Sequence, residues 1–151
     1  MRYIITDIDG TLVHHSSARL RALEQRNWDA YHTLFDMDNI NVGVIQAISG
    51  AASFFGRRIV AWTGSSDAYY QSRITFLRNQ FGSFRIHDLH MRKGLDHTLS
   101  NCELKREWAK YYDPREVSIV YEDQIHVAEM LRDLGYNVCY VMVEKQFGET
   151  V

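Results

Sequence analysis

The sequence predicts an α/β fold, a three-layer α/β/α sandwich around a mainly parallel five-stranded sheet. Three observations predict it. Short apolar runs alternate with helical patterns, polar side chains follow three of these runs, and a segment of about 28 residues interrupts the alternation after the first run. Strands that alternate with helices form parallel sheets with helices on both faces and right-handed crossovers.

Five segments are predicted to be strands. Residues 2–6 (RYIIT) are nearly all apolar and rich in β-formers, which suits a strand buried on both faces of a parallel sheet. Three later runs have the same character, and a fifth run shows the pattern less clearly. These are residues 58–63, 117–121 and 138–143, with 85–91 as the fifth.

Four apolar stripes with three- and four-residue steps predict helices whose apolar sides face the core. The stripes are Val42, Ile45, Ile48, Ala52 and Phe55; Tyr70, Ile74, Leu77 and Phe81; Leu104, Trp108 and Tyr111; and Val127, Met130, Leu131 and Leu134. Gly135 is placed to end the last helix in a left-handed conformation. The single proline, Pro114, predicts a turn before the strand at 117–121.

A long segment, residues 14–41, separates the first strand from the first core helix. It is too long for a plain loop between a strand and a helix. It also carries bulky apolar side chains, namely Leu20, Leu23, Trp28, Tyr31, Leu34 and Phe35. We expect a small helical cap here, lying over the C-terminal end of the first strand. Residues 1–151 show no linker or repeat, so we expect one domain that includes this cap.

The composition is that of a globular protein. Hydrophobic residues make up 46% of the chain and charged residues 24%, which argues against disorder and against a membrane-embedded class. A formal charge of -2 argues against a protein that coats nucleic acid by charge alone. Cys102 and Cys139 lack the spacing of a zinc ribbon or redox pair. No apolar run reaches the length of a membrane span and no signal peptide is recognisable, so we expect a cytoplasmic protein.

Polar side chains gather where the predicted strands end. Asp7 and Asp9 follow the first strand, residues 63–66 follow the second, and Glu122 and Asp123 follow the strand at 117–121. Ligands of open α/β sheets bind outside the carboxyl ends of the strands. Because clustered carboxylates repel one another, a cation would stabilise them, and converging oxygens form the shell that Mg²⁺ prefers.

A phosphate group would find partners among the same residues. Thr63 offers a hydroxyl, and Gly64 and Ser65 offer backbone N–H groups that lead into a helix. Lys105, on the helix that begins near residue 100, supplies the positive charge that a transferring phosphoryl group needs.

Each feature also has an ordinary structural explanation. The D-x-D-G segment could form a turn, Glu122 and Asp123 could cap the helix that follows them, and residues 63–66 could cap another. Lys105 could be a solvated surface lysine. Their orderly succession at strand ends favours a shared site.

Together these residues resemble the four motifs of the haloacid dehalogenase (HAD) superfamily of phosphotransferases. The first motif, an apolar strand ending in DxDGT and then Leu or Val, is matched in full by residues 7–12. Thr63 matches the second, Lys105 is the best candidate for the third, and Glu122 with Asp123 matches the fourth. The motifs span residues 3–123 in order, and the resemblance implies a Rossmann-like α/β/α fold.

Within the superfamily, residues 91–108 and 119–141 resemble the phosphatase part of phage-type polynucleotide kinase/3′-phosphatases. Three departures are visible. The kinase half is absent, Ser65 stands where those phosphatases often have an arginine, and Glu122 replaces the first aspartate of their usual Asp-Asp pair.

The resemblance implies an Mg²⁺-dependent phosphomonoester hydrolase with an aspartyl-phosphate intermediate. Asp7 would be the nucleophile, and Asp9 would first protonate the leaving oxygen and then accept a proton from water. Mg²⁺ would be held by the Asp7 carboxylate, the Asp9 carbonyl and Asp123, with Glu122 behind them or bridged by water. The phosphate would be held by two further catalytic residues, Thr63 and Lys105, and by four substrate-binding residues, Thr11, Gly64, Ser65 and Arg92.

The cap is expected to select the substrate. Its Arg19, Arg21 and Arg26 could pair with phosphates while Trp28 and Tyr31 stack on a base, or the segment could be an amphipathic helix with a solvated basic face. A second basic feature, Arg92 with Lys93, is expected at the mouth of the cleft.

The expected partner is a nucleic-acid 3′-phosphate end or a phosphorylated small molecule, without a membrane or an obligate protein partner. The alternative is a nucleotide or small-metabolite phosphatase. A response-regulator receiver fits less well, because a receiver has its acidic pair near the first strand and its phosphoacceptor after a later one. A non-catalytic phosphate-binding module is disfavoured because Asp7, Asp9, Thr63 and the acidic pair are all present. The seven histidines lack the ligand spacing of a zinc site.

Overall fold

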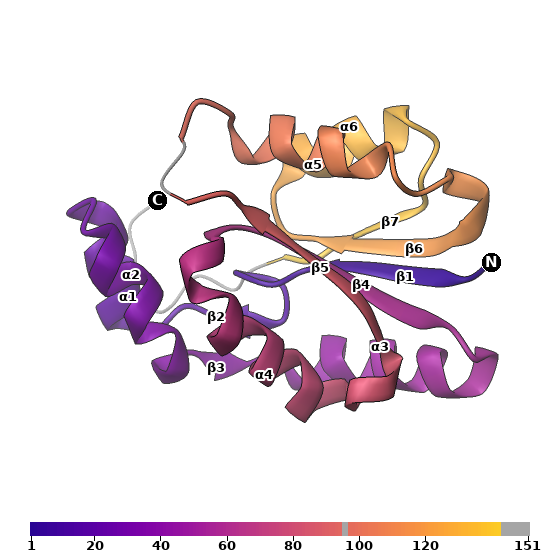
Figure 1. The fold of residues 1–151 in the computed structure, drawn as a ribbon, viewed down its shortest axis with the longest axis horizontal. Helices are drawn as coiled ribbons and strands as arrows, with labels where there is room; N and C mark the ends of the chain where they lie inside the picture. The colour runs from indigo at the N-terminus through magenta and orange to yellow at the C-terminus, as the bar shows by residue number, and fades with distance from the viewer. Residues whose placement is uncertain (95–96, 143–151) are drawn as a thin grey trace.

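The computed structural model describes residues 1–94 and 97–142 and contains a central five-stranded sheet (Figure 1). The strands lie in the order β5-β4-β1-β6-β7, and each neighbouring pair is parallel. Their bounds are β1 Tyr3–Asp7, β4 Arg58–Ser66, β5 Ile86–Arg92, β6 Val117–Glu122 and β7 Val138–Tyr140. The α/β fold with a mainly parallel five-stranded sheet is confirmed.

Helices cover both faces of this sheet, and Figure 1 shows α3 and α4 on one side and α5 and α6 on the other. Their bounds are α3 Val42–Phe55, α4 Tyr70–Phe81, α5 Asn101–Ala109 and α6 Ile125–Asp133. Three short 3-10 turns connect them to the strands, namely η2 Asp67–Tyr69, η3 Ser83–Arg85 and η4 Pro114–Glu116. No helix in the described part of the chain is long and apolar enough to cross a membrane.

The central strand β1 divides the core into two halves. Ile4 packs with the side chains of α3 and α4, Ile5 packs with those of α5 and α6, and both are fully buried. Trp62 of β4 lies in the second half. A strand covered on both faces needs apolar side chains at every position rather than at alternate ones. The apolar run before Asp7 therefore fixes β1 at the centre of the sheet and brings Asp7 to its carboxyl end.

Several element ends follow local signals in the sequence. The Ser100 hydroxyl accepts a hydrogen bond from the Glu103 amide, and the Glu103 carboxylate accepts one from the Ser100 amide, which is the capping box that starts α5. Gly135 follows α6 with a φ of 98°, as predicted for a left-handed residue. Pro114 is the first residue of η4, in the turn predicted before β6.

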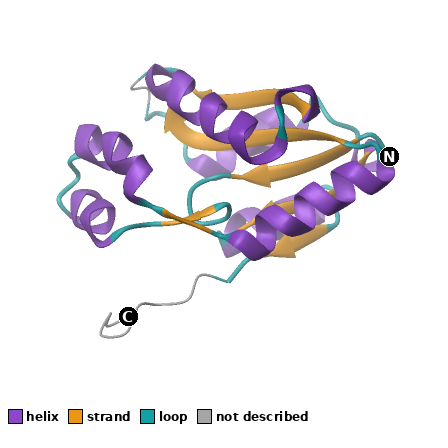
Figure 2. Cartoon of the chain, turned by 90° about the horizontal axis from the view of Figure 1, so that it is seen from below, coloured by secondary structure: helices purple, strands orange, loops and turns teal. Residues whose placement is uncertain are grey.

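A helical insertion follows the first strand, within the segment predicted to form the cap. Two short antiparallel strands, β2 and β3, form its stem, with Val13 opposite Ile40. Figure 2 shows the crossed stem carrying the two helices beyond the end of the sheet. The elements are β2 Val13–His14, α1 Ser17–Glu24, α2 Trp28–Thr33, η1 Leu34–Met37 and β3 Asn39–Ile40. We call residues 13–40 the cap.

Each predicted strand is corrected at one or both bounds, and β1 and β6 shift by a single residue. β4 continues past Thr63 to Ser66, where β5 still pairs with it. β5 begins at Ile86 rather than Arg85, because Arg85 belongs to η3. β7 ends at Tyr140, and the predicted end of that strand at Val143 lies outside the described residues.

Five of the outer members of the apolar stripes are wrong as core positions. Between 41% and 75% of these side chains is exposed, and they are Val42, Phe55, Tyr70, Tyr111 and Leu134. Val42 and Phe55 are the first and last residues of α3, and Tyr70 is the first residue of α4. Tyr111 and Leu134 follow the last residues of α5 and α6. All five therefore lie at a helix end or just past one.

Two substitutions in α3 test this correction. Ile48→Ala removes a fully buried side chain and is expected to lower the free energy of unfolding by about 2–5 kcal/mol. Val42→Ala, at a position that is 58% exposed, is expected to change it by less than about 0.5 kcal/mol. Urea unfolding followed by circular dichroism measures both, and similar losses for the two variants would contradict the assigned burial.

Candidate active site

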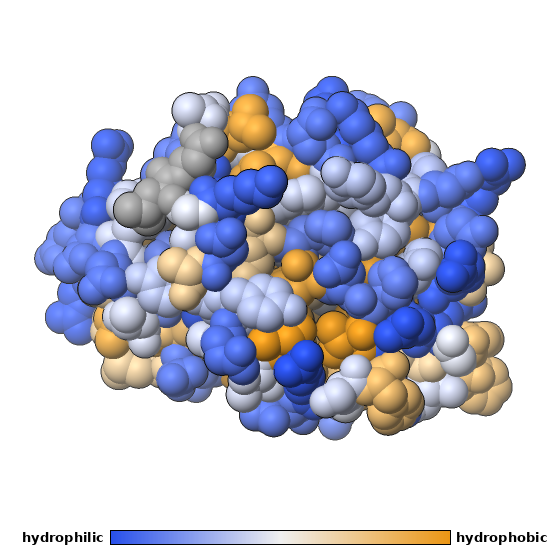
Figure 3. Space-filling model, in the orientation of Figure 1, coloured by the Kyte–Doolittle hydropathy of each residue, from blue (hydrophilic) through white to orange (hydrophobic). Residues whose placement is uncertain are grey.

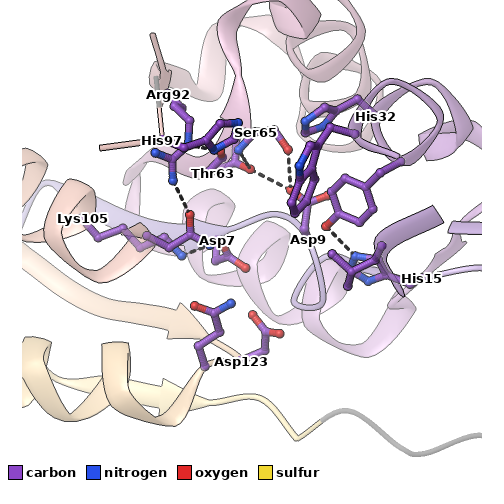
Figure 4. Close-up of a pocket in the computed structure, with 16 residues that line it drawn as sticks. Asp7, Asp9, His15, His32, Thr63, Ser65, Arg92, His97, Lys105 and Asp123 are labelled. Atoms are coloured by element: carbon purple, nitrogen blue, oxygen red, sulfur yellow. Dashed lines mark hydrogen bonds and ion pairs between the residues drawn. The ribbon is translucent and has the colours of Figure 1, made fainter. Parts of the chain in front are cut away.

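A cavity of about 350 Å³ lies at the carboxyl ends of β1 and β4, between the sheet and the cap. Figure 4 shows Asp7 and Lys105 on one side of it and Asp9 with cap residues on the other. Eight of the ten residues predicted for the site line this cavity, namely Asp7, Asp9, Thr63, Gly64, Ser65, Arg92, Lys105 and Asp123. The parallel order of the strands brings them together from positions more than a hundred residues apart.

Asp7 and Lys105 form a buried ion pair at the floor of the cavity. The Lys105 Nζ donates to Asp7 Oδ1 and to Glu122 Oε2, each at 2.7 Å. The remaining Glu122 oxygen, Oε1, accepts from the amides of Asp123 and Gln124, both at 3.1 Å. Glu122 therefore holds Lys105 against Asp7 and has both of its oxygens engaged.

Thr11 does not line the cavity, which corrects its predicted contact with substrate. Its side chain is fully buried, and its hydroxyl lies 3.0 Å from Asp7 Oδ2 and 3.1 Å from Asp123 Oδ1. Gly10 makes this approach possible. Its φ is 86°, and a Cβ at this position would lie 2.2 Å from Asp123 Oδ2. The turn after β1 thus packs against the acidic pair of β6.

The charges of this cluster are not balanced by Lys105 alone. Burial, together with the neighbouring carboxylates Glu122 and Asp123, raises the pKa of Asp7 well above its usual range despite the lysine. Burial also raises the pKa of Asp123 to about 6. Burial opposes the charged form of Lys105, but Asp7 and Glu122 outweigh it and raise the lysine's pKa. The site carries more negative charge than its one cation can satisfy.

These carboxylates fit a divalent cation. Asp7, Glu122 and Asp123 each offer an oxygen, and the three atoms lie within 4.8 Å of one another. Oxygen ligands of this kind are the ones Mg²⁺ binds. Asp123 lies at the cavity wall, where its Oδ1 accepts a hydrogen bond from the Thr11 hydroxyl. The excess negative charge and the oxygen donor set both favour such an ion.

Asp9 has a very different environment, although it lies two residues from Asp7. Arg19 Nη2 contacts Asp9 Oδ1 at 2.7 Å, and Oδ2 accepts from the hydroxyls of Thr63 at 2.7 Å and Ser65 at 3.1 Å. Burial alone would raise the pKa of Asp9, but Arg19, Arg73 and these hydrogen bonds outweigh burial and hold the pKa well below its usual range. Asp9 is therefore ionised.

Arg19 corrects the prediction of a basic cap face that pairs with phosphates. It is fully buried, its guanidinium pairs with Asp9 and Asp38, and its Nε donates to the Tyr31 carbonyl at 2.6 Å. The guanidinium also lies 4.2 Å from the centre of the Tyr31 ring. The sequence analysis missed this role because Asp38 is 19 residues away and only the β2-β3 stem brings it back. The other two arginines of the cap, Arg21 and Arg26, are exposed and do not line the cavity.

Arg92 lies in the cavity wall rather than at an open mouth. It is 5% exposed, and it donates to the carbonyls of Gly64 and Leu99 and to Asn101 Oδ1 at 2.9, 2.6 and 2.8 Å. A Cβ on Gly64 would lie 2.0 Å from Asn101 Oδ1, so only glycine allows this approach. Arg92 thus joins the end of β4 to the start of α5. Its predicted neighbour in the basic feature, Lys93, is exposed.

Ser65 contributes differently from the prediction. Its amide donates to the Thr63 hydroxyl at 3.1 Å, so this N–H is not free for a phosphate. Its own hydroxyl is directed at Asp9. Thr63 and Ser65 together orient the Asp9 carboxylate.

The cap side of the cavity is aromatic, as Trp28 and Tyr31 were expected to make it. The Trp28 ring stacks on His97 with ring centres 5.8 Å apart, and it meets Tyr31 edge-on at 5.9 Å. Tyr31 also shares a hydrogen bond of 2.9 Å with His15. Burial lowers the pKa of His32 to about 4, so this histidine is neutral at pH 7.

Three histidines, His15, His32 and His97, belong to the cavity wall and were missed by sequence reasoning. They were considered only as zinc ligands. Their positions 15, 32 and 97 carry no local spacing signal, and the fold alone brings them together. Asn101 and Gln124 line the cavity as well and follow, respectively, the N-cap of α5 and the acidic pair.

A family model and several solved structures are similar to this chain. The family model described as the polynucleotide kinase PNKP phosphatase domain matches residues 1–146. Two solved structures are titled as the Pnkp1/Rnl/Hen1 complex and as the Pnkp1/Rnl/Hen1 RNA repair complex. They share 21% and 19% identity with this chain, with TM-scores of 0.67 and 0.71, and both comparisons cover 95% of it. The chain spans 47% and 43% of those two chains, less than half of their length.

A further solved structure is a HAD family enzyme from Bacteroides thetaiotaomicron, an aspartate-to-alanine mutant in complex with magnesium and inorganic phosphate. It shares 8% identity with a TM-score of 0.62, and the comparison covers 98% of this chain and 97% of that one. At this identity the likeness shows the fold. Among curated proteins, none matches the sequence.

The family match covers nearly the whole sequence, and the acidic cavity lies where the four motifs converge. The chain therefore belongs to the family of polynucleotide kinase PNKP phosphatase domains, within the HAD superfamily.

Proposed function

We propose that this chain is an Mg²⁺-dependent phosphomonoester hydrolase that acts through an aspartyl-phosphate on the 3′-phosphate ends of nucleic acids. The observation that carries the proposal is the contrast between Asp7 and Asp9. Both carboxylates face one cavity, but one lies against a lysine and other carboxylates and the other is held by an arginine and two hydroxyls. Two carboxylates in different environments can take different roles in one reaction.

Asp7 is the nucleophile in this proposal. Its attack on phosphorus forms the aspartyl-phosphate and expels the alcohol, so that hydrolysis is split into two steps. Lys105 and Thr11 each contact one Asp7 oxygen and fix the orientation of the carboxylate. Lys105 is also close enough to the cavity to reduce the repulsion between the carboxylate and an incoming phosphate.

Asp9 moves the protons. It gives a proton to the departing oxygen and then accepts one from the water that cleaves the aspartyl-phosphate. The low pKa of Asp9, set by Arg19, Arg73 and the hydrogen bonds to its carboxylate, favours the ionised form that suits the second of these steps. An incoming phosphate dianion beside Asp9 favours its protonated form by like-charge repulsion, which suits the first. Arg19, Thr63 and Ser65 keep the carboxylate directed into the cavity throughout.

The residues that would hold Mg²⁺ are the Asp7 carboxylate, the Asp9 carbonyl and Asp123, with Glu122 behind them. When bound, the ion would neutralise the repulsion between these carboxylates and the phosphate and polarise a phosphoryl oxygen. Glu122 serves mainly to accept hydrogen bonds from the Lys105 ammonium group and from the backbone amides of Asp123 and Gln124.

The aromatic cap wall supports a substrate that carries a base. Trp28 is 38% exposed and lies in the cavity wall with His97 and Tyr31, so a base next to the terminal phosphate could stack there. The family match and the solved structure titled as an RNA repair complex favour a nucleic-acid end over a sugar phosphate. We place the enzyme in the cytoplasm, with the nucleic-acid end as its partner.

Replacing the nucleophile tests the chemistry. Asp7→Asn is expected to abolish hydrolysis of p-nitrophenyl phosphate in the presence of Mg²⁺, because an amide cannot form the aspartyl-phosphate. Asp36→Asn, an exposed position on the cap, is the control and should keep full activity. A folded Asp7→Asn variant with measurable turnover would remove Asp7 from this role.

Replacing Asp123 tests the metal independently of turnover. Mg²⁺ at a hundred times its Kd stabilises the wild type by about 2.7 kcal/mol, which raises Tm by roughly 5–10 °C for a chain of this size. Asp123→Asn should lose most of this Tm shift in thermal denaturation with and without EDTA, whereas Asp36→Asn should keep it. An undiminished shift in Asp123→Asn would argue against Asp123 as a ligand.

A substrate panel tests the specificity. We expect kcat/KM for a 3′-phosphorylated oligonucleotide to exceed that for its 5′-phosphorylated counterpart, for mononucleotides and for sugar phosphates. Trp28→Ala should raise KM for the oligonucleotide by about 5- to 150-fold, as expected for one lost stacking contact, and leave p-nitrophenyl phosphate nearly unaffected. Tyr111→Ala, at an exposed aromatic residue outside the cavity, is the control. A preference for mononucleotides would instead support a nucleotide phosphatase.

A further inference from the structure

Three phenylalanines are exposed at the end of the sheet opposite the cavity. Phe54 is 83% exposed, Phe55 58% and Phe84 76%. Phe54 and Phe55 form the last turn of α3, and Phe84 belongs to η3. Figure 3 shows a group of hydrophobic side chains gathered at this end of the molecule, around the end of α3. Single exposed apolar side chains are common, but a group of three phenylalanines indicates an interaction surface.

These elements enclose a second cavity of about 170 Å³. It is lined by small residues, a phenylalanine and arginines, namely Ala52, Ser53, Gly56, Arg57, Arg58, Phe84 and Arg85. Since a water molecule occupies about 30 Å³, the cavity has room for several waters or for one bulky apolar side chain.

The rim of this cavity is positively charged. Arg57, Arg58 and Arg85 line it, and none of the three forms an ion pair with a carboxylate within the described ranges. Their hydrogen bonds within the described residues are made to carbonyls, from Arg58 to Ile86 at 3.0 Å and from Arg85 to Ser49 at 3.4 Å. The chain as a whole has a net charge of -2, so this rim is a local excess of positive charge.

The arginines lie over the phenylalanine rings. The Arg57 guanidinium is 4.4 Å from the centre of the Phe55 ring, and that of Arg85 is 5.1 Å from the Phe84 ring. These guanidinium groups cover ring faces on which bases would stack, which disfavours a nucleic-acid strand. A guanidinium held over a ring still offers N–H groups at its edges, and these fit a carboxylate in bidentate fashion.

The position of this surface separates it from the chemistry. Arg58 begins β4 and Thr63 lies five residues further along it, so the surface is about 17 Å from the active-site end of the strand. An occupant here would leave the cavity below the cap open. The surface is therefore suited to a partner and not to the reacting phosphate.

From these observations we infer that the surface formed by Phe54, Phe55, Phe84, Arg57, Arg58 and Arg85 docks an acidic protein segment that carries one bulky apolar side chain. The apolar side chain enters the 170 Å³ cavity and carboxylates flanking it pair with the arginines. Aromatic residues and arginine are the side chains that contribute most at interfaces, which agrees with this composition.

A synthetic nonapeptide of glutamates and aspartates with a central phenylalanine is the probe. Titrated into ¹⁵N-labelled protein, it is expected to shift amide resonances at the end of α3 and in η3, and to leave those of the Asp7 and Asp9 segment in place. The same peptide with a central alanine should bind at least about fivefold more weakly, because the cavity loses its apolar occupant.

Variants of the surface complete the test. Arg57→Glu and Phe84→Ser should each reduce peptide affinity at least about fivefold without changing hydrolysis of p-nitrophenyl phosphate, whereas the control Arg132→Glu on α6 should bind as the wild type does. Phe54→Ser replaces the most exposed of the three rings, so it should leave the fold intact and also reduce peptide affinity.

Three results would overturn the inference. They are equal binding of the phenylalanine and alanine peptides, shifts produced instead by a single-stranded oligothymidylate, and self-association through the patch in sedimentation velocity that Phe84→Ser abolishes. Because the readout is binding and not turnover, a failure here is distinguishable from a failure of the proposed phosphatase activity.

Discussion

The burial of three carboxylates beside one lysine is the constraint on which the rest of the site depends. Asp7, Glu122 and Asp123 end neighbouring parallel strands or follow them directly, and Lys105 contacts only two of the three. The cost of burying this charge is offset by surrounding contacts rather than by the lysine alone. The capping box fixes where α5 begins and therefore where Lys105 lies relative to Asp7. Gly10 lets the turn after β1 approach Asp123.

The second constraint is the cap, which acts on Asp9. The stem of β2 and β3 returns Asp38 to the start of α1, and Asp38 with Tyr31 holds Arg19 in place. Arg19 then binds one oxygen of Asp9 while the end of β4 binds the other. The insertion thus supplies part of the electrostatic environment of Asp9. The same insertion carries the aromatic side chains that face the cavity.

The two ends of the sheet have different characters. The carboxyl ends collect acidic residues and the cap, whereas the amino ends of β4 and β5 carry arginines and exposed phenylalanines. Loops and strand ends can diverge in this way because the apolar interior of the sheet requires little more than β-rich sequence covered by helices. The chain can therefore keep its chemistry at one end and present an unrelated surface at the other.

The sequence by itself determined the parallel α/β sheet and the position of the motifs, since apolar runs, helical periodicity and the DxDGT signature are local patterns. Residue type and strand-end position were enough to select Asp7, Asp9, Thr63 and Asp123, and Lys105 was selected as a lysine near the start of a helix. Tertiary structure decided which partners those residues have. Arg19, expected to bind phosphate, is a buried partner of Asp9, and Thr11 contacts the carboxylates of Asp7 and Asp123. Arg92 joins the end of β4 to the start of α5. The physical reason is that these hydrogen bonds and ion pairs join residues that are far apart along the chain. Which residues pair therefore depends on how the β2-β3 stem brings the two ends of the cap together and on the order of strands in the sheet, and no local sequence pattern encodes either.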